Sequence, residues 1–314
     1  MAPTILVVGA TGNTGKNVVR SLPYLLANNK MSYRILGLTR SLDSPASQKL
    51  AKLPHVEMQG KDWTTIDAAW LQSREVVRVY IAPHNLPNQF VEESAFYAAL
   101  LNAGVKYVVR VSTNVKYISP TSPVYYGRSH WAIENLLGQP AFKNLQWTSL
   151  QPNFYTASYL MSAANWIKAY RKSGKQETLA IVPANDAAVA MIDPEDVGSV
   201  GAHLLALEDP TPHSQVCYVL SGPEDVTGQR IVELVEQYTG VKVQKVEFKA
   251  TDFIEDLVKK GVYPEKVLPS ILAGFEPLWQ GECKLDGTPT SREIMELTPP
   301  RRTVVDALEV MLGE

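Results

Sequence analysis

The sequence has few cysteines, no surplus of charge of either sign and no long apolar run. Its two cysteines, Cys217 and Cys283, lie far apart, which excludes a disulfide-stabilised scaffold and matches no metal-binding spacing. The 30 basic and 32 acidic residues nearly cancel, so neither a nucleic-acid-binding surface nor an acidic tail is indicated. No apolar run approaches the length of a membrane span. We therefore expect a cytoplasmic monomer or homodimer with no nucleic-acid or membrane partner.

What the sequence does contain is an apolar run that leads directly into spaced glycines. Residues 5–8 (ILVV) precede the segment GATGNTG, whose glycines are at 9, 12 and 15. A strand followed by a glycine-rich turn lets the backbone approach a pyrophosphate, and the next helix offers free N–H groups to it. This pattern predicts a dinucleotide-binding loop. Its predicted cofactor contacts are Gly9, Thr11, Gly12, Asn13, Thr14 and Gly15.

Strand-like and helix-like segments alternate through the first half of the chain. Short apolar, β-branched runs predict strands, and segments with one apolar helical face predict helices. The predicted strands are 5–8, 33–39, 56–59, 76–81, 105–112 and 145–151; the predicted helices are 16–27, one ending at 71, 89–103 and one within 123–137. Such alternation is typical of crossover helices on a parallel sheet. The predicted fold class is therefore α/β, a Rossmann-like doubly wound parallel sheet.

The second half is less regular and predicts a smaller C-terminal α+β lobe. Helices are predicted at 154–170, 227–238, 252–260 and 264–275, and strands at 187–192 and 215–220, with a helix that begins at Asp193-Pro194. We expect residues 1–153 to form the dinucleotide-binding domain, with a strand and a helix added from about 187–222. Residues 154–314 are then mainly the substrate-binding lobe.

Short motifs spread over residues 5 to about 223 resemble those of NmrA-like atypical short-chain dehydrogenases/reductases. Besides the glycine loop they are LTR at 38–40, GKD at 60–62, VST at 111–113, HWAIE at 130–134, LQPNF at 150–154, DPEDV at 193–197 and LSGP at 220–223. The resemblance implies a nicotinamide dinucleotide at the strand ends and a substrate between the lobes. The family includes isoflavone-type and quinone reductases, fungal biosynthetic enzymes and redox sensors without catalysis, so it fixes the fold better than the function.

The residue after the second strand predicts which dinucleotide is bound. Arg40 stands there and no Asp or Glu does, and a guanidinium suits the 2′-phosphate of NADP(H). Lys61 and Asp62 are expected near the adenine, with a turn and helix cap as the alternative. Further predicted cofactor contacts follow the fourth, fifth and sixth strands, and are Ala82, Pro83, Ser112, Pro152 and Phe154.

The chemical centre is expected in the segment YGRSH at 126–130. The resemblance implies that Tyr126 is an acid or base, and that His130 stands where a lysine is usual and also holds the nicotinamide ribose. Tyr126, His130 and Glu134 are spaced by four, so they share one helix face. We predict a Tyr–His–Glu relay, with Glu134 as a helix anchor the alternative. The sequence leaves open whether Tyr125 or Tyr126 faces the cleft.

Polar and aromatic side chains near the strand ends and in the second half predict the substrate pocket. Thr113 is expected to hydrogen-bond the substrate, as is Ser112 in the alternative. No Ser-His-Asp arrangement, zinc motif or P-loop is present, so no metal site is predicted. The predicted pocket residues are His84, Asn85, Asn114, Tyr155, Tyr159, Phe275 and Trp279.

Three functions are compatible with these patterns. The first is an NADPH-dependent reductase of a bulky apolar enone, imine or carbonyl compound, in secondary metabolism. The second, motivated by the histidine at position 130, is a non-redox cyclase or isomerase of alkaloid-type secondary metabolism that retains NADP(H) as a structural cofactor. The third is an NADP(H)-sensing regulatory protein without catalysis.

Overall fold

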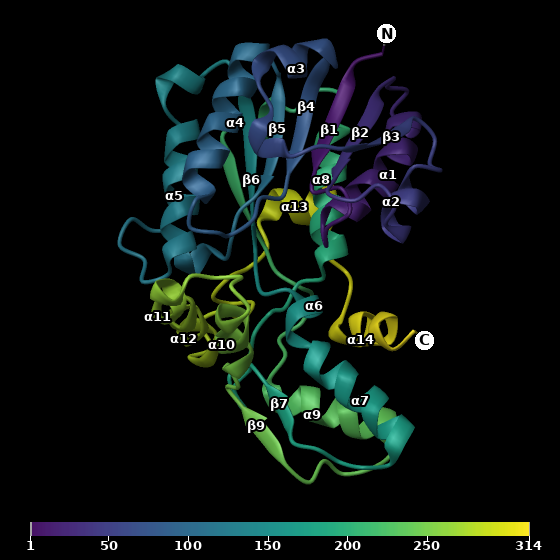
Figure 1. The fold of residues 1–314 in the computed structure, drawn as a ribbon, viewed down its shortest axis with the longest axis vertical. Coiled ribbons are helices and arrows are strands. Elements are labelled where there is room, and N and C mark those ends of the chain that lie inside the picture. The colour runs from purple at the N-terminus through teal and green to yellow at the C-terminus, as the bar shows by residue number, and fades with distance from the viewer. Residues whose placement is uncertain (1, 314) are drawn as a thin grey trace.

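The computed structural model describes residues 2–313, and its centre is a seven-stranded parallel sheet (Figure 1). The strand order is β3-β2-β1-β4-β5-β6-β8. The chain adds β2 and β3 on one side of β1 and the later strands on the other side, so the order of addition changes between β1 and β4. The predicted Rossmann-like parallel sheet is confirmed. The strands are β1 (Thr4–Val8), β2 (Arg34–Thr39), β3 (Val56–Gly60), β4 (Val76–Ile81), β5 (Tyr107–Val111), β6 (Gln146–Pro152) and β8 (Val216–Leu220).

Both faces of the sheet are apolar, so helices cover both. In β1, Ile5 and Val7 belong to one core cluster, while Leu6 and Val8 belong to another, because successive side chains point to opposite faces. The first face packs against α1 (Gly15–Asn28) and α8 (Pro194–Leu205), with α2 (Pro45–Leu50) beside α1. The second face packs against α3 (Ala68–Ser73), α4 (Gln89–Ala103) and α5 (Tyr125–Leu137).

A smaller α+β layer lies beyond the carboxyl ends of the strands (Figure 1). It has its own core, which includes Ile167, Ile181 and Val235. Its elements are α6 (Thr156–Tyr159), α7 (Met161–Ser173), β7 (Leu179–Ile181), α9 (Gly228–Thr239), β9 (Val246–Phe248), α10 (Asp252–Lys259), α11 (Leu268–Leu272), α12 (Glu276–Trp279) and α14 (Val304–Leu312). Short 3-10 helices are η1 (Trp63–Thr65), η2 (Val115–Tyr117), η3 (Pro140–Phe142), η4 (Thr211–His213), η5 (Glu265–Val267) and η6 (Ala273–Phe275).

The chain passes between the two layers more than once. Helix α8 and strand β8 lie with the large sheet, and α13 (Arg292–Leu297) also returns to it and packs on α8. The domain boundary at residue 153 stays a prediction. Within residues 2–313, no helix combines the length and the apolar character that crossing a bilayer requires.

Several predicted elements need correction. Residues 187–192 are not a strand: Val189 and Ile192 make only isolated bridges, to Val226 and Tyr155. The helix predicted over 154–170 is divided into α6 and α7, and the one ending at 71 is η1 followed by α3. The paired strands β7 and β9 were not predicted, because three residues are too few to give a periodic pattern.

The glycine loop packs tightly upon itself where β1 passes into α1. A Cβ atom on Gly15 would lie only 2.2 Å from the carbonyl oxygen of Gly9. Gly9 itself has a φ of +80°, a conformation that residues with side chains rarely adopt. The loop shape therefore depends on glycine at both positions, whether or not a ligand is bound.

We expect Gly15→Ala to lower the free energy of unfolding by about 1–3 kcal/mol, because the added methyl must displace the backbone of Gly9. The matched control is Gly138→Ala at the end of α5, where the nearest atoms would lie 3.6 Å from the new methyl. That variant should stay within about 0.5 kcal/mol of the unaltered protein. Urea unfolding of both variants measures the difference, and equal stabilities would contradict the packing argument.

Candidate active site

A groove of about 460 Å³ runs along the carboxyl ends of β1, β2, β4 and β5. It begins at the glycine loop and ends beside Asn85 and Tyr155. Arg40 and Lys61 lie on its walls, and no Asp or Glu belongs to the lining. The predicted cofactor residues that line it are Gly9, Thr11, Gly12, Asn13, Thr14, Arg40, Lys61, Ala82, Pro83 and Ser112.

The loop at the start of this groove fits a bound phosphate. Within residues 2–313, the backbone N–H groups of Thr11, Asn13 and Thr14 donate no hydrogen bond, although Gly12 N–H is used by Gly9. The loop is tied to β2 by a contact of 3.3 Å between the hydroxyls of Thr11 and Thr39. Free donors at the N-terminal end of α1 form the anion-binding arrangement expected for a pyrophosphate.

The two cations of the groove fit an additional phosphate. Neither Arg40 nor Lys61 has an ion-pair partner among the described residues, so both charges are available to a ligand. Asp62 was predicted as a cofactor contact, but its carboxylate accepts hydrogen bonds from the N–H and hydroxyl of Thr64, at 3.0 and 2.8 Å. It caps η1 outside the groove lining, which is the alternative that the sequence left open.

A second cavity of about 310 Å³ lies where the large sheet meets the smaller layer. Its lining contains no Asp, Glu, Lys, Arg or His and is dominated by aromatic rings. Most remaining lining residues are apolar or carry amides and hydroxyls, among them Thr113, Asn114 and Ile254. The aromatic residues are Tyr117, Tyr125, Tyr126, Phe154, Tyr155, Tyr159, Phe253, Tyr263 and Phe275.

Asn85, Ser112 and Tyr155 line both the groove and the cavity. We call them the junction residues. They come from the segments that follow β4, β5 and β6, whose carboxyl ends meet at this edge of the sheet. A ligand in the groove and a second ligand in the cavity would meet beside these three side chains, so this is where chemistry between them is expected.

The structure brings most predicted pocket residues together. Both Tyr125 and Tyr126 line the cavity, so the choice between them does not arise. The Asn114 amide donates to Asn153 at 2.8 Å, and its oxygen accepts from the Lys116 N–H at 2.9 Å. Predicted residues that line the cavity are Thr113, Asn114, Tyr126, Tyr159 and Phe275, together with the junction residues Asn85 and Tyr155.

Other predicted residues lie elsewhere. His84 lines the groove instead of the cavity, with its Nε2 2.6 Å from the carboxylate of Glu92. Trp279 lies behind the cavity wall, stacked on Phe275 with 5.7 Å between ring centroids. Besides Asp62, the residues predicted at the cofactor that do not line the groove are Gly15, His130, Pro152 and Phe154, of which the last two line the cavity.

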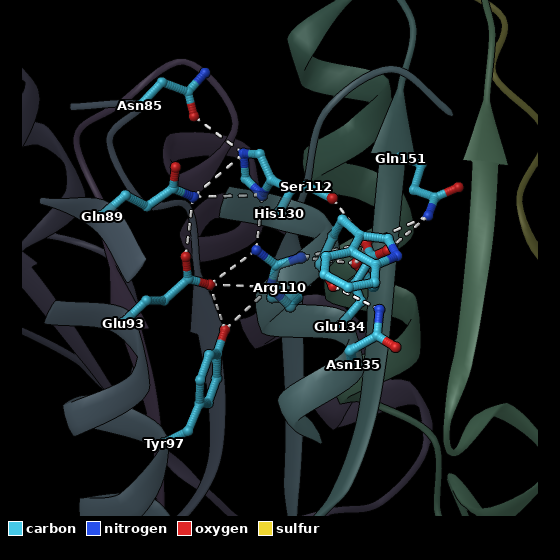
Figure 2. A network of polar contacts seen from close by, with 12 residues as sticks. Asn85, Gln89, Glu93, Tyr97, Arg110, Ser112, His130, Glu134, Asn135 and Gln151 are labelled. Atoms are coloured by element: carbon cyan, nitrogen blue, oxygen red, sulfur yellow. Dashed lines mark hydrogen bonds and ion pairs between the residues drawn. The ribbon is translucent and has the colours of Figure 1, made fainter. Parts of the chain in front are cut away.

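A buried polar network lies behind the junction (Figure 2). Its centre is Arg110 on β5, whose side chain is fully buried. Arg110 donates to Glu93 of α4 at 2.9 Å and to the ring Nδ1 of His130 at 2.8 Å, and lies 3.3 Å from the carboxylate of Glu134. Glu134 in turn accepts from Ser112 at 2.8 Å. The network therefore joins α4, α5 and β5 through one cation.

The predicted Tyr126–His130–Glu134 relay is replaced by this network. His130 and Glu134 each contact Arg110, no hydrogen bond among residues 2–313 links either of them to Tyr126, and neither lines the groove or the cavity. Burial and the nearby charge of Arg110 hold the pKa of His130 well below its usual value. His130 is therefore a neutral, hydrogen-bonded residue one layer behind the site, and Glu134 is the anchor that the sequence offered as the alternative.

Sequence reasoning missed Arg110, although a signal was present. The strand reads VKYVVRVS, and a charged residue in a run that is covered on both faces must find buried partners. Glu93 carries the matching signal, since Gln89, Glu93 and Tyr97 recur every four residues on the buried face of α4.

We expect Arg110→Leu to lower the free energy of unfolding by about 3–5 kcal/mol, because it leaves the carboxylate of Glu93 buried without its cation. The control is Arg292→Leu, which removes an exposed pair whose side chains are 88% and 62% exposed. Its effect should stay below about 1 kcal/mol. Chemical denaturation of both variants tests this, and a stable Arg110→Leu protein would contradict the role of the network.

Comparison with known proteins agrees with this architecture. The family model described as the NmrA-like family matches residues 1–305. An NAD(P)H azoreductase of Xenophilus azovorans is 30% identical over 242 residues, which cover 77% of this chain and 76% of the azoreductase. The solved structure of an NADPH-dependent quinone oxidoreductase of Escherichia coli, complexed with NADPH, has a TM-score of 0.71 and 20% identity, with 98% of this chain and 99% of that chain covered.

A second solved structure has a fold similar to that of this chain. The triphenylmethane reductase of a Citrobacter species, complexed with NADP(H), has a TM-score of 0.71 and 19% identity, with 98% of this chain and all of that chain covered. The family model spans nearly the whole chain, and the match with the azoreductase covers more than two thirds of both proteins. Membership of the family follows directly. The chain belongs to the NmrA-like family.

Proposed function

We propose that this protein is an NADPH-dependent reductase of a bulky, flat, uncharged small molecule. The observation that carries the proposal is the meeting, at Asn85, Ser112 and Tyr155, of a cationic groove with an aromatic cavity that has no charged lining. The activity of the azoreductase relative supports the same reaction class.

Different residues of the groove suit different parts of the cofactor. The free N–H groups of the loop at 11–14 suit its pyrophosphate, and Arg40 with Lys61 suits a 2′-phosphate. NADPH, when bound there, supplies a hydride. The absence of any carboxylate from the groove lining favours the phosphorylated dinucleotide, because the ribose hydroxyls of NAD are held by an acidic side chain in this fold.

The cavity favours a flat conjugated substrate without negative charge. Aromatic rings offer apolar faces and stacking, and no cation in the lining could neutralise a sulfonate or carboxylate. The tyrosine hydroxyls and amides supply the few polar contacts. We propose an enone, imine or carbonyl compound, which extends to quinones and to azo compounds because the relatives are named for them.

Tyr126 is the proton donor that we propose for the reduced substrate. The hydroxyls of Tyr117 and Tyr125 are engaged, by the carbonyl groups of Gly274 and Asn85. Among the cavity tyrosines within residues 2–313, the hydroxyls of Tyr126, Tyr155, Tyr159 and Tyr263 have no hydrogen-bond partner. We propose Tyr126 among these four because it stands in the segment whose family resemblance implies an acid or base. Burial raises the pKa of Tyr126, so this hydroxyl keeps its proton at neutral pH until a more basic substrate atom forms.

Arg40→Ala should weaken NADPH binding about tenfold to a hundredfold and leave NADH affinity within about twofold, because a charge-assisted contact to phosphate is removed. The control is Lys106→Ala, an exposed cation that precedes β5 at the opposite edge of the sheet. Fluorescence titration of both dinucleotides measures the two affinities. Equal losses for NADPH and NADH would place Arg40 away from the 2′-phosphate.

The activity itself is tested with NADPH and a panel of enones, imines, quinones and neutral or sulfonated azo dyes, followed by NADPH absorbance. We expect consumption with neutral members, little with sulfonated ones, and a loss of about a hundredfold or more in kcat for Tyr126→Phe. Tyr263→Phe, which alters another cavity tyrosine, is the matched control.

Each other outcome favours a different function. Product formation without NADPH consumption would favour the cyclase or isomerase. Tight binding with a strong preference for one redox state and no turnover would favour the sensor. An unchanged rate for Tyr126→Phe would remove that residue as the donor. The cytoplasmic location, the place in secondary metabolism and the monomeric or dimeric state remain predictions from the sequence.

A further inference from the structure

The junction residue Asn85 is held from behind by His130. The His130 ring, which is 1% exposed, places Nε2 3.1 Å from the side-chain oxygen of Asn85. We propose that His130 is a positioning residue that fixes the Asn85 amide, so that its NH₂ group is presented at the junction as a donor to an acceptor atom of the bound molecules. This inference rests on the proposed function for the identity of those molecules, but its hydrogen-bond directions follow from the protein alone.

Arg110 determines where the proton of His130 lies. A guanidinium can only donate, and its Nη2 is 2.8 Å from Nδ1 of the ring. Nδ1 must therefore carry a lone pair and no hydrogen. Burial and the charge of Arg110 both disfavour the imidazolium, so the single ring proton is on Nε2. The cation on β5 thus selects one tautomer of a residue on α5.

The Nε2 proton in turn determines the orientation of Asn85. An N–H donor at Nε2 requires an acceptor opposite, which is the amide oxygen of Asn85 and not its nitrogen. Figure 2 shows the oxygen turned to the ring and the nitrogen turned away. The nitrogen makes no hydrogen bond within residues 2–313. The backbone oxygen of Asn85 is fixed as well, because it accepts from Tyr125.

The other polar groups around the ring do not alter this assignment. Gln89 of α4 places its amide nitrogen 3.0 Å from Glu93, 3.3 Å from Nε2 of His130 and 3.4 Å from Nδ1, where it can donate to the same lone pair as Arg110. An amide nitrogen cannot accept the Nε2 proton, so Asn85 is its acceptor. Glu93 is directed to Arg110 and Gln89, and Glu134, one turn after His130 on α5, is also directed to Arg110.

The contact between Glu134 and Ser112 makes Ser112 an acceptor at the junction, whereas Asn85 is a donor. A carboxylate can only accept, so the Ser112 hydroxyl donates its hydrogen to Glu134 over 2.8 Å and has only lone pairs left for the junction. The junction therefore presents a donor at Asn85 and an acceptor at Ser112. A carbonyl, quinone or azo acceptor atom fits the Asn85 side, and a carboxamide N–H fits the Ser112 side.

The first test is a double-mutant cycle measured with NADPH and whichever panel compound the unaltered protein reduces. We expect His130→Leu and Asn85→Ala each to lower kcat/KM about tenfold, the size of one lost hydrogen bond. The double variant should be no worse than either single variant, because His130 acts through Asn85. Losses that multiply to about a hundredfold would overturn the proposal.

A conservative variant separates positioning from structural support. Gln at position 130 retains an N–H for Asn85 and an oxygen for Arg110, so His130→Gln should recover most of the lost kcat/KM. Urea unfolding and NADPH titration accompany every variant. If kcat/KM falls only in proportion to the folded fraction, or if His130→Gln recovers nothing while His130→Leu is fully folded, positioning by this hydrogen bond is wrong.

The second test needs no turnover and therefore remains decisive if the proposed reductase function fails. Nitrogen-15 NMR of the unaltered protein, with His130→Leu used to assign the signal, should show Nε2 protonated and Nδ1 unprotonated. The signal should not change between about pH 6 and 8, a range that includes the ordinary histidine pKa of about 6.5. A proton on Nδ1, or titration within that range, would contradict the assignment even in an active enzyme.

Discussion

The buried charge of Arg110 is the constraint on which the organisation of the site depends. A guanidinium without solvent is tolerated only where charged and polar partners surround it, and here they come from α4, α5 and β6. Because its partners cannot move away without leaving this charge uncompensated, the packing of two helices on one face of the sheet is fixed together with the orientation of the junction side chains.

The parallel sheet supplies the rest of the geometry. Every strand of it ends at the same edge, so the loops after β1, β2, β4 and β5 form one continuous groove, and those after β5 and β6 border the cavity. Under the proposed function, cofactor binding and substrate binding thus use different parts of the same edge. The cationic groove uses backbone N–H groups and two surface cations, whereas the cavity depends on rings from both layers.

The sequence predicts the groove better than the cavity. Gly9, Arg40 and Ala82 follow strands with clear apolar patterns, so their meeting at one edge follows from parallel topology. Phe253 and Tyr263 belong to a segment whose position depends on tertiary packing, and no local periodicity could place them. His130 was expected among the reacting groups because it lies four residues after Tyr126 on one helix. The two residues do lie on α5, but the His130 ring contacts Arg110 and does not line the cavity, and Arg110 lies on another element.

The origin of the cavity wall has an evolutionary consequence. Phe253, Ile254, Leu257 and Tyr263 lie in or just after α10, and all follow the last motif that resembles the family, at 220–223. Among residues 252–263, the side-chain hydrogen bonds and ion pairs stay within α10 itself, so apolar contacts attach this segment to the body. Substitutions there can reshape the space for a substrate without altering the loop, the cations or the buried arginine. Under the proposed function, a change of substrate range with an unchanged cofactor groove is therefore accessible to this chain by changes in about a dozen consecutive residues.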